Sequence, residues 1–196
     1  YNRIKTINAG SRVPAIAVRT ANPSNATWKT GQTLCYNKLN QYDSPAPTYA
    51  DTITDCADVL YPGQDGALQE GVAWPTPRFT DNGDSTITDN LTGLIWLQDA
   101  NCMKTHYPEA DQDQWQYHDP NDGKVNWQHA LDFVAGINAG TYAECGAGQT
   151  DWHLPNIREL NSLLDLGKVG DNTGGSILPD GHPFSNVETA YWSSTT

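Results

Sequence analysis

An acidic stretch between Lys104 and Lys124 contains the side chains best suited to holding a metal ion. Hard cations such as Ca²⁺ prefer oxygen ligands, which carboxylates supply. The candidate ligands are Asp111, Asp113, Asp119 and Asp122. Ca²⁺ is therefore the one cofactor that the sequence suggests. The favoured alternative is a solvated acidic loop, because the stretch is polar throughout, although long loops in compact domains often carry a function.

Two aromatic residues, Trp115 and Tyr117, lie within the same stretch. Trp and Tyr present large, rigid surfaces that stack on sugar rings and anchor protein interfaces. The chain is rich in both types, with seven Trp and nine Tyr against three Phe. Trp115 and Tyr117 are therefore candidate ligand-binding residues, with a glycan or a surface protein as the expected partner.

The cysteines predict disulfide bonds and an exported protein. None of the four lies in a CxxC spacing, which argues against zinc ribbons and thiol redox motifs. An even number of well-separated cysteines fits two disulfides formed in an oxidising compartment. We expect Cys35 to pair with Cys56 and Cys102 with Cys145, because each pair lies within one region of the chain. The alternative is four buried free thiols in a cytosolic protein.

Catalytic chemistry has little support in the sequence. The five histidines stand at His106, His118, His129, His153 and His182, and neither HExxH nor GxSxG occurs. A glycosidase remains an alternative, because its two catalytic carboxylates are brought together by the fold and need no particular spacing in the sequence. We expect a protein that is not an enzyme.

The amino-terminal part of the chain is basic and the remainder is acidic. Residues 1–42 hold six Lys and Arg and no acid, whereas all 23 acids follow. An acidic body does not attract nucleic acid or anionic membranes. No apolar run approaches the roughly 20 residues that a membrane helix needs. The basic arm complements an acidic body, either its own or that of a neighbouring copy.

Residues 78–97, RFTDNGDSTITDNLTGLIWL, predict a β-meander. Short segments with β-branched and aromatic residues are separated by turn signals at Asn82-Gly83 and Asp89-Asn90. The first of these turns has several oxygen-bearing side chains but lacks the closing glutamate of a calcium-binding loop. We therefore expect a plain hairpin turn there.

Two helices are predicted further along the chain. Apolar residues recur at helical spacing between Asn126, a suitable cap, and Gly140, a suitable stop. A second apolar stripe runs from Asn156 to Gly167, and Glu159 stands where it would complete a capping box with Asn156. Both helices must pack their apolar stripes against the sheet, because short isolated helices are marginal in water.

These segments carry a family resemblance. The strings RFTDNGDSTITDNLTGLIWLQDANC, WQHAL, DWHLPNIRELNSLLD and HPFSNVETAYWSSTT are similar to the Lcl C-terminal domain family of bacterial exported and surface proteins. The resemblance spans roughly residues 30–196. It implies an α+β fold like that of C-type lectins, with two helices packed on small antiparallel sheets and long loops. The expected organisation is a basic arm at 1–29, a loop-rich lead-in with a disulfide at 30–77, and the domain at 78–196.

The resemblance also bears on sugar binding and on assembly. In sugar-binding C-type lectins a Trp-Asn-Asp triplet helps to hold calcium, and Trp192-Ser193-Ser194 stands in its place. The usual calcium-dependent sugar site is therefore not expected, and Trp192 is expected in the core. The family domain continues past YWSSTT into further strands, so we expect an open sheet edge here. An open edge is a template for another strand.

The extended basic arm is an available strand for that edge. Residues expected to take part in assembly are Arg3, Ile4, Lys5, Ile7, Arg12 and Arg19. The resulting hypothesis is a non-enzymatic extracellular or cell-surface structural protein that self-associates into a filament. The alternative is a surface adhesion or ligand-binding domain without the usual lectin calcium site.

Overall fold

The computed structural model describes residues 14–20, 28–36, 53–54, 56–58, 63–113, 120–168 and 177–195. The chain divides into two compact units. Unit 1 comprises residues 1–24, 75–163 and 180–196, and unit 2 comprises 25–74 and 164–179. Both helices and antiparallel strands are present, as the α+β prediction requires. In the part of the chain that the structure describes, no helix has the length and apolar character needed to cross a bilayer.

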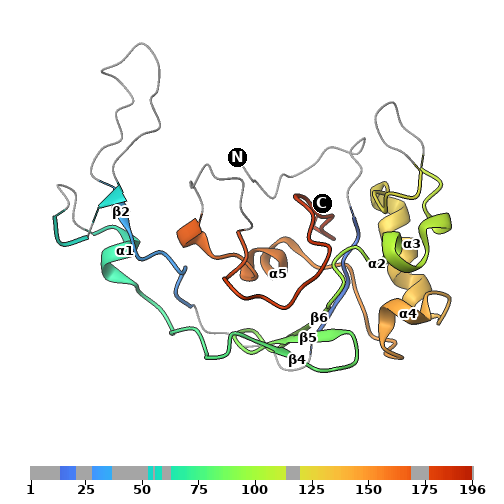
Figure 1. Ribbon diagram of the computed structural model, residues 1–196, viewed down its shortest axis with the longest axis horizontal. Helices are drawn as coiled ribbons and strands as arrows, with labels where there is room; N and C mark the ends of the chain where they lie inside the picture. The colour runs from blue at the N-terminus through green and yellow to red at the C-terminus, as the bar shows by residue number, and fades with distance from the viewer. Residues whose placement is uncertain are drawn as a thin grey trace, which may run out of the picture. The chain divides into compact units, whose positions relative to one another are not determined.

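Unit 1 is built on a four-stranded antiparallel sheet (Figure 1). Three strands, β4 (Phe79–Asp81), β5 (Thr86–Asp89) and β6 (Leu94–Leu97), form the predicted meander. The fourth strand, β1 (Val18–Thr20), comes from the basic arm and pairs with β6, giving the order β1-β6-β5-β4. The sheet therefore combines a local meander with one strand from far away in the sequence.

The turn between β4 and β5 is a plain hairpin turn, as predicted. Gly83 adopts a φ of 76°, in the left-handed region that glycine enters without steric cost. The carboxylates of Asp81 and Asp84 accept hydrogen bonds from the main-chain N–H groups of Gly83 and Thr86. The acidic side chains of this turn thus bind their own backbone.

Most helices of unit 1 contact one another, and several share an apolar core with the sheet. The first predicted helix is α3 (Trp127–Asn138), and the Asn126 side chain caps it by accepting a hydrogen bond from the N–H of His129. The other elements are α2 (Cys102–His106), η2 (Pro108–Ala110) and α4 (Ala143–Gly146). The Cys102–Cys145 disulfide, which joins α2 to α4, is the predicted pairing.

The second predicted helix is shorter than expected. Helix α5 (Ile157–Ser162) begins with the predicted capping box of Asn156 and Glu159, but it ends at Ser162 and not at Gly167. The main-chain carbonyl of Ser162 accepts a hydrogen bond from the Arg78 guanidinium at 2.7 Å, and the Ser162 hydroxyl donates to the Glu159 carbonyl. Both interactions compete with continuation of the helical hydrogen-bond pattern.

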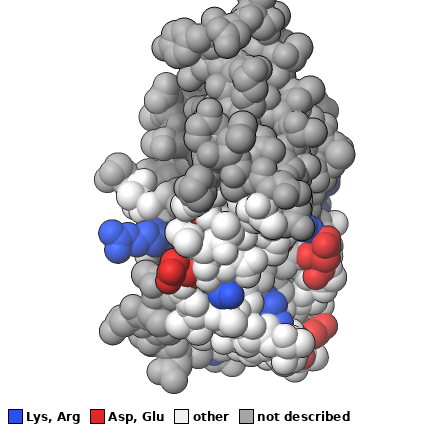
Figure 2. All heavy atoms as spheres, turned by 90° about the vertical axis from the view of Figure 1, so that its left-hand side faces the viewer, with Lys and Arg blue, Asp and Glu red and all other residues white. Residues whose placement is uncertain are grey.

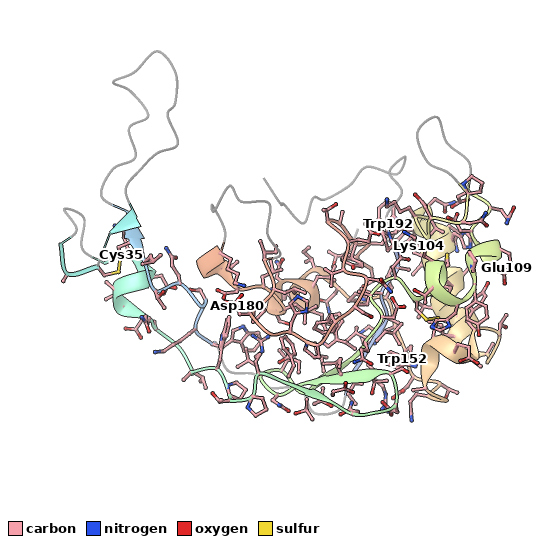
Figure 3. The ribbon with its side chains drawn as sticks, in the orientation of Figure 1. Cys35, Lys104, Glu109, Trp152, Asp180 and Trp192 are labelled. Atoms are coloured by element: carbon pink, nitrogen blue, oxygen red, sulfur yellow. A yellow bond between two sulfur atoms is a disulfide. The ribbon has the colours of Figure 1, made fainter. Side chains whose placement is uncertain are left out.

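One apolar core joins the sheet to the helices. It includes Ala15 and Ala17 beside β1, Leu97 of β6, Phe133 and Ile137 of α3, and the aromatic side chains of Trp152 and Trp192. Trp152 and Trp192 are labelled in Figure 3, where both are surrounded by other side chains. Trp192 is only 5% exposed, as expected, and its indole N–H donates to the Val125 carbonyl at 2.7 Å.

Unit 2 is small and contains the other predicted disulfide, Cys35–Cys56. Its elements are β2 (Cys35–Tyr36), β3 (Ile53–Thr54), η1 (Cys56–Asp58), α1 (Asp65–Leu68) and η3 (Leu166–Lys168). Strands β2 and β3 pair with each other. The Trp74 indole N–H donates to the Lys29 carbonyl, and the Thr30 hydroxyl binds the Asp65 carboxylate. Unit 2 thus combines most of the predicted lead-in with residues 164–179.

Figure 2 shows both positively and negatively charged side chains among uncharged ones on the described part of this face, and some of opposite sign lie next to each other. The described part of this face therefore carries no patch of one charge sign, in contrast to the separation of basic and acidic residues along the sequence.

Candidate functional site

The segment Pro14–Thr20 is held between two parts of unit 1, and we call the residues that hold it the β1 site. One side is β6, with Val18 opposite Trp96 and Thr20 opposite Leu94. On the other side, the N–H of Val18 donates to the carbonyl of His153 at 3.0 Å, and the N–H of His153 donates to the carbonyl of Val18 at 2.9 Å. The segment therefore receives main-chain hydrogen bonds from both sides.

Two longer main-chain contacts extend the β1 site towards Pro14. The N–H of Leu97 approaches the carbonyl of Ala17 at 3.5 Å, and the N–H of Trp192 approaches the carbonyl of Pro14 at 3.4 Å. The β1 site thus consists of β6, residues 152–154 and Trp192. Figure 1 shows the dark blue β1 segment running alongside β6.

The segment is buried as deeply as a central strand, although β1 is the last strand in the sheet order. Ala15, Ile16, Ala17 and Val18 are all at most 3% exposed. A continuous apolar run is typical of strands covered on both faces. The apolar run of the arm is therefore part of the core of unit 1.

One ion pair ties the segment to the body of its own chain. The Arg19 guanidinium forms two hydrogen bonds with the Asp151 carboxylate, Nε to Oδ1 at 2.7 Å and Nη2 to Oδ2 at 2.9 Å. The Arg19 hydrogen bond is the main reason why the pKa of Asp151 lies below its usual value. Arg19 is the one predicted assembly residue within the described chain. The other five, Arg3, Ile4, Lys5, Ile7 and Arg12, lie outside the described residues.

The interpretation of residues 104–124 as a solvated acidic loop is wrong for Asp111, which is completely buried. Its carboxylate accepts hydrogen bonds from the N–H groups of Gly123 at 3.0 Å and Asp113 at 3.2 Å. Burial raises the pKa of Asp111, and these two hydrogen bonds partly offset that effect. Asp111 is buried because main-chain donors away from water need acceptors, and a carboxylate supplies two oxygens.

Asp113 connects the acidic stretch to the start of α3. Its Oδ2 accepts hydrogen bonds from the main-chain N–H and the side-chain Nδ2 of Asn126, at 2.8 and 2.9 Å. The same oxygen lies 3.4 Å from Nδ1 of His129. Asp113 therefore supports the residue that caps α3.

Of the four predicted calcium ligands, Asp111, Asp113 and Asp122 are described, and these three are not arranged as a metal-binding group. Asp122 forms a 3.6 Å ion pair with Lys124 and accepts a hydrogen bond from the Lys124 N–H. Asp119 lies outside the described residues, as do Trp115 and Tyr117. Among the residues that the structure does describe, no group of three or more His, Cys, Asp or Glu side chains is arranged to hold a metal ion. Calcium binding by this stretch stays a prediction.

A small pocket lies beside the Cys102–Cys145 disulfide, with a volume of about 80 Å³. The disulfide and Leu97 provide apolar surface, and the polar lining residues are Ser85, Gln98, Asp99, His106, Glu144 and Ser185. No sequence motif indicated this pocket, because its lining comes from five separate segments. The predicted 102–145 pairing was the one signal that α2 and α4 meet here.

Sequence reasoning also missed a buried ion pair at the other end of the sheet. Arg78 binds both carboxylate oxygens of Asp89, at 2.9 and 3.1 Å, and Asp89 is completely buried. The Thr92 hydroxyl donates to the same carboxylate. The Asp-x-x-Thr spacing in the turn before β6 was visible in the sequence, but it did not reveal the distant Arg78 partner.

The comparison with family models identifies the class of protein that these elements define. The model of the Lcl C-terminal domain matches residues 85–196, which include β5, β6, helices α2 to α5 and Trp192. The chain therefore belongs to the Lcl C-terminal domain family. No curated protein and no solved structure matches the chain. The match begins after β1, so Pro14–Thr20 lies outside the family region whose core it completes.

Proposed function

We propose that this protein is a non-enzymatic, extracellular structural subunit that self-associates through its basic amino-terminal arm. The observation that carries the proposal is the placement of Pro14–Thr20. This segment lies outside the family match, yet the family region holds it with main-chain hydrogen bonds and buries its apolar side chains. A domain that binds an extended arm has the means to join copies of itself.

Charge and covalent chemistry support the same proposal. All 23 acids follow residue 42, and the arm brings cations to an acidic body, as the Arg19–Asp151 ion pair illustrates. Two disulfides, one in each unit, fit a protein of an oxidising compartment, and we therefore propose export to the cell surface or beyond. We further propose that the domain is a member of the C-type-lectin-like folds, supported by the small antiparallel sheet with packed helices and by the family membership.

Negative-stain electron microscopy combined with sedimentation tests the proposal. The full chain is expected to form ordered assemblies whose fraction rises with protein concentration and falls with added salt, because salt screens exposed charges. The variant R3Q/K5Q removes two arm cations and is expected to shift assembly to higher concentration. A matched control, K104Q/R158Q, changes the net charge equally at two exposed positions of the body and is expected to assemble normally. Single particles at every concentration would overturn self-association.

The pocket beside the Cys102–Cys145 disulfide supports a second candidate function, the recognition of one edge of a sugar residue in a surface glycan. Two carboxylates, two hydroxyls and an imidazole line a space with an apolar side. This combination suits a hydroxylated or aminated sugar edge, because such groups donate hydrogen bonds to carboxylates. Trp115 and Tyr117 remain the aromatic candidates for a larger glycan site.

Titration with D-glucosamine and D-glucose, followed by amide chemical shifts, tests this second function. Shifts at Gln98 and Cys102 that saturate for the amine and weaken in Glu144→Gln would support binding in the pocket. Glu109→Gln, at an exposed carboxylate outside the pocket lining, is the control. Saturable shifts that persist unchanged in W115A/Y117A would remove those two aromatic residues from the site. No saturable shift with either sugar would contradict sugar binding in this pocket.

A further inference from the structure

We infer that self-association proceeds by strand exchange, in which Pro14–Thr20 of one copy occupies the β1 site of a second copy. This inference rests on the proposed function and names its joining segment and its receiving site. The contacts would be those that the segment makes within one chain, so exchange needs no new interface. Exchange of an identical element between copies is a low-cost route to oligomers.

The chemistry of the contacts makes the segment transferable. The hydrogen bonds on both sides of Val18 and at Pro14 and Ala17 join main-chain atoms to main-chain atoms. The side chains that enter the core are small or aliphatic, namely Ala15, Ile16, Ala17 and Val18. Any copy presents the same atoms in the same order, so the β1 site cannot distinguish its own segment from that of a neighbour.

A vacant β1 site would destabilise the domain. We therefore expect a strand to occupy the site, from the same chain or from another. Without Pro14–Thr20, the N–H and carbonyl of His153 and the outer edge of β6 would lose their main-chain partners. Apolar surface on Leu97, Leu154 and Trp192, which belong to the same core as Ala15 and Ala17, would also be uncovered. An exposed strand edge next to apolar surface is a site for strand addition.

No disulfide holds the segment in the β1 site of its own chain. The two disulfides join Cys35 to Cys56 and Cys102 to Cys145, and both lie outside Pro14–Thr20. The Arg19–Asp151 ion pair lies at the surface, with 54% of the Asp151 side chain exposed. An exposed ion pair is worth about 1 kcal/mol or less, so it sets the register of the segment more than it prevents departure.

The direction of exchange determines the kind of assembly. The donated segment and the receiving site are different surfaces of the same molecule, so a one-way donation joins copies head to tail. Head-to-tail contacts give rings when the rotation closes and filaments when it does not. Reciprocal exchange between two copies gives a closed dimer instead, which sedimentation distinguishes from a filament.

Cross-linking between two single-cysteine variants tests the exchange. Chains carrying R19C and chains carrying D151C are co-expressed, assembled and treated with a short bismaleimide. The two positions face each other in the ion pair, so a cross-linked heterodimer requires that the segment of one chain lie in the β1 site of another. We expect this product to exceed by several-fold that from R19C mixed with A135C, which places the second thiol at an exposed position of α3.

The double variant R19C/D151C is the positive control for cross-linking, because its two thiols can be joined either within one chain or between chains. Assemblies that contain no R19C–D151C heterodimer, while the double variant links within single chains, would overturn strand exchange and leave self-association standing. A wild-type chain that stays monomeric would overturn the proposed function itself. The two failures are therefore distinguishable.

Discussion

The basic segment around β1 and the acidic stretch around Asp111 are both predicted from the sequence to be exposed and available for binding. In the structure, residues of both regions are buried in unit 1. They differ in what holds them. Pro14–Thr20 is held by main-chain hydrogen bonds and aliphatic contacts, whereas Asp111 and Asp113 accept hydrogen bonds through particular carboxylate oxygens. The first type of contact requires only main-chain atoms and buried aliphatic side chains, which a neighbouring copy would present equally. The second type of contact depends on the chemistry of single side chains.

A charge in the apolar part of the β1 segment is expected to produce the largest effect. Ala17 is completely buried, so Ala17→Asp places a carboxylate in the core without a designed partner. We expect a loss of at least about 3 kcal/mol in the free energy of unfolding, measured by chemical denaturation. Ala135→Asp, at an exposed position of α3, is the control. Equal losses in the two variants would contradict the role of the segment in the core.

Removal of the Asp113 carboxylate is expected to have the next largest effect. Asp113→Ala leaves the Asn126 N–H and Nδ2 without their acceptor and weakens the start of α3. The expected loss in unfolding free energy is about 1–3 kcal/mol, with faster amide exchange in the first turn of α3. Glu109→Ala removes an exposed carboxylate from the same stretch and is expected to change little. An unchanged α3 in Asp113→Ala would show that the contact is dispensable.

The raised pKa of Asp111 predicts a characteristic pH dependence. A carboxylate with a folded-state pKa above its unfolded value is penalised once it ionises. The contribution of Asp111 to stability therefore begins to fall above pH 3.8, the ordinary pKa of an aspartate. It continues to fall until the pH has passed the raised pKa of the folded state. The free energy of unfolding is measured from pH 3 to 8 for the wild type and for Asp111→Asn. As pH rises, the value for the wild type should decrease relative to that for the variant. A difference that stays constant with pH would contradict a raised pKa of Asp111 in the folded protein.

The Arg19–Asp151 ion pair is expected to give the smallest effect on stability. A double-mutant cycle of R19Q and D151N should give a coupling of about 0.2–1 kcal/mol that decreases with salt. Because the pKa of Asp151 is lowered, this coupling is present above its ordinary value of 3.8 and is lost as pH falls through the folded-state pKa. A coupling that is insensitive to both salt and acid would contradict a surface ion pair.

Local patterns predicted much of the fold. The meander, the start and end regions of α3 and the capping box of α5 each depend on residues within a few positions of one another. The two disulfide pairings were also predicted, because each bond stays within one sequence region. Family membership followed from the ordered motifs, although the matched region is shorter than the resemblance suggested.

Contacts between distant segments could not be predicted in the same way. The early end of α5 depends on Arg78, which lies 84 positions from Ser162 in the sequence. The pairing of β1 with β6 depends on backbone atoms that any extended segment possesses, so no residue type marks the partner. The burial of Asp111 depends on the N–H of Gly123, twelve residues away across the acidic stretch.

One hydrogen bond at the β1 site involves an amide whose hydrogen exchange reports how often the site opens. The N–H of His153 donates to the carbonyl of Val18, so it is protected from solvent while β1 stays in place. Its deuterium uptake requires the segment to leave, either alone or as part of a wider opening of the sheet. The exchange rate of this single amide, compared with that of an amide in the β5–β6 pair, would therefore measure how often a site becomes vacant for a strand from elsewhere.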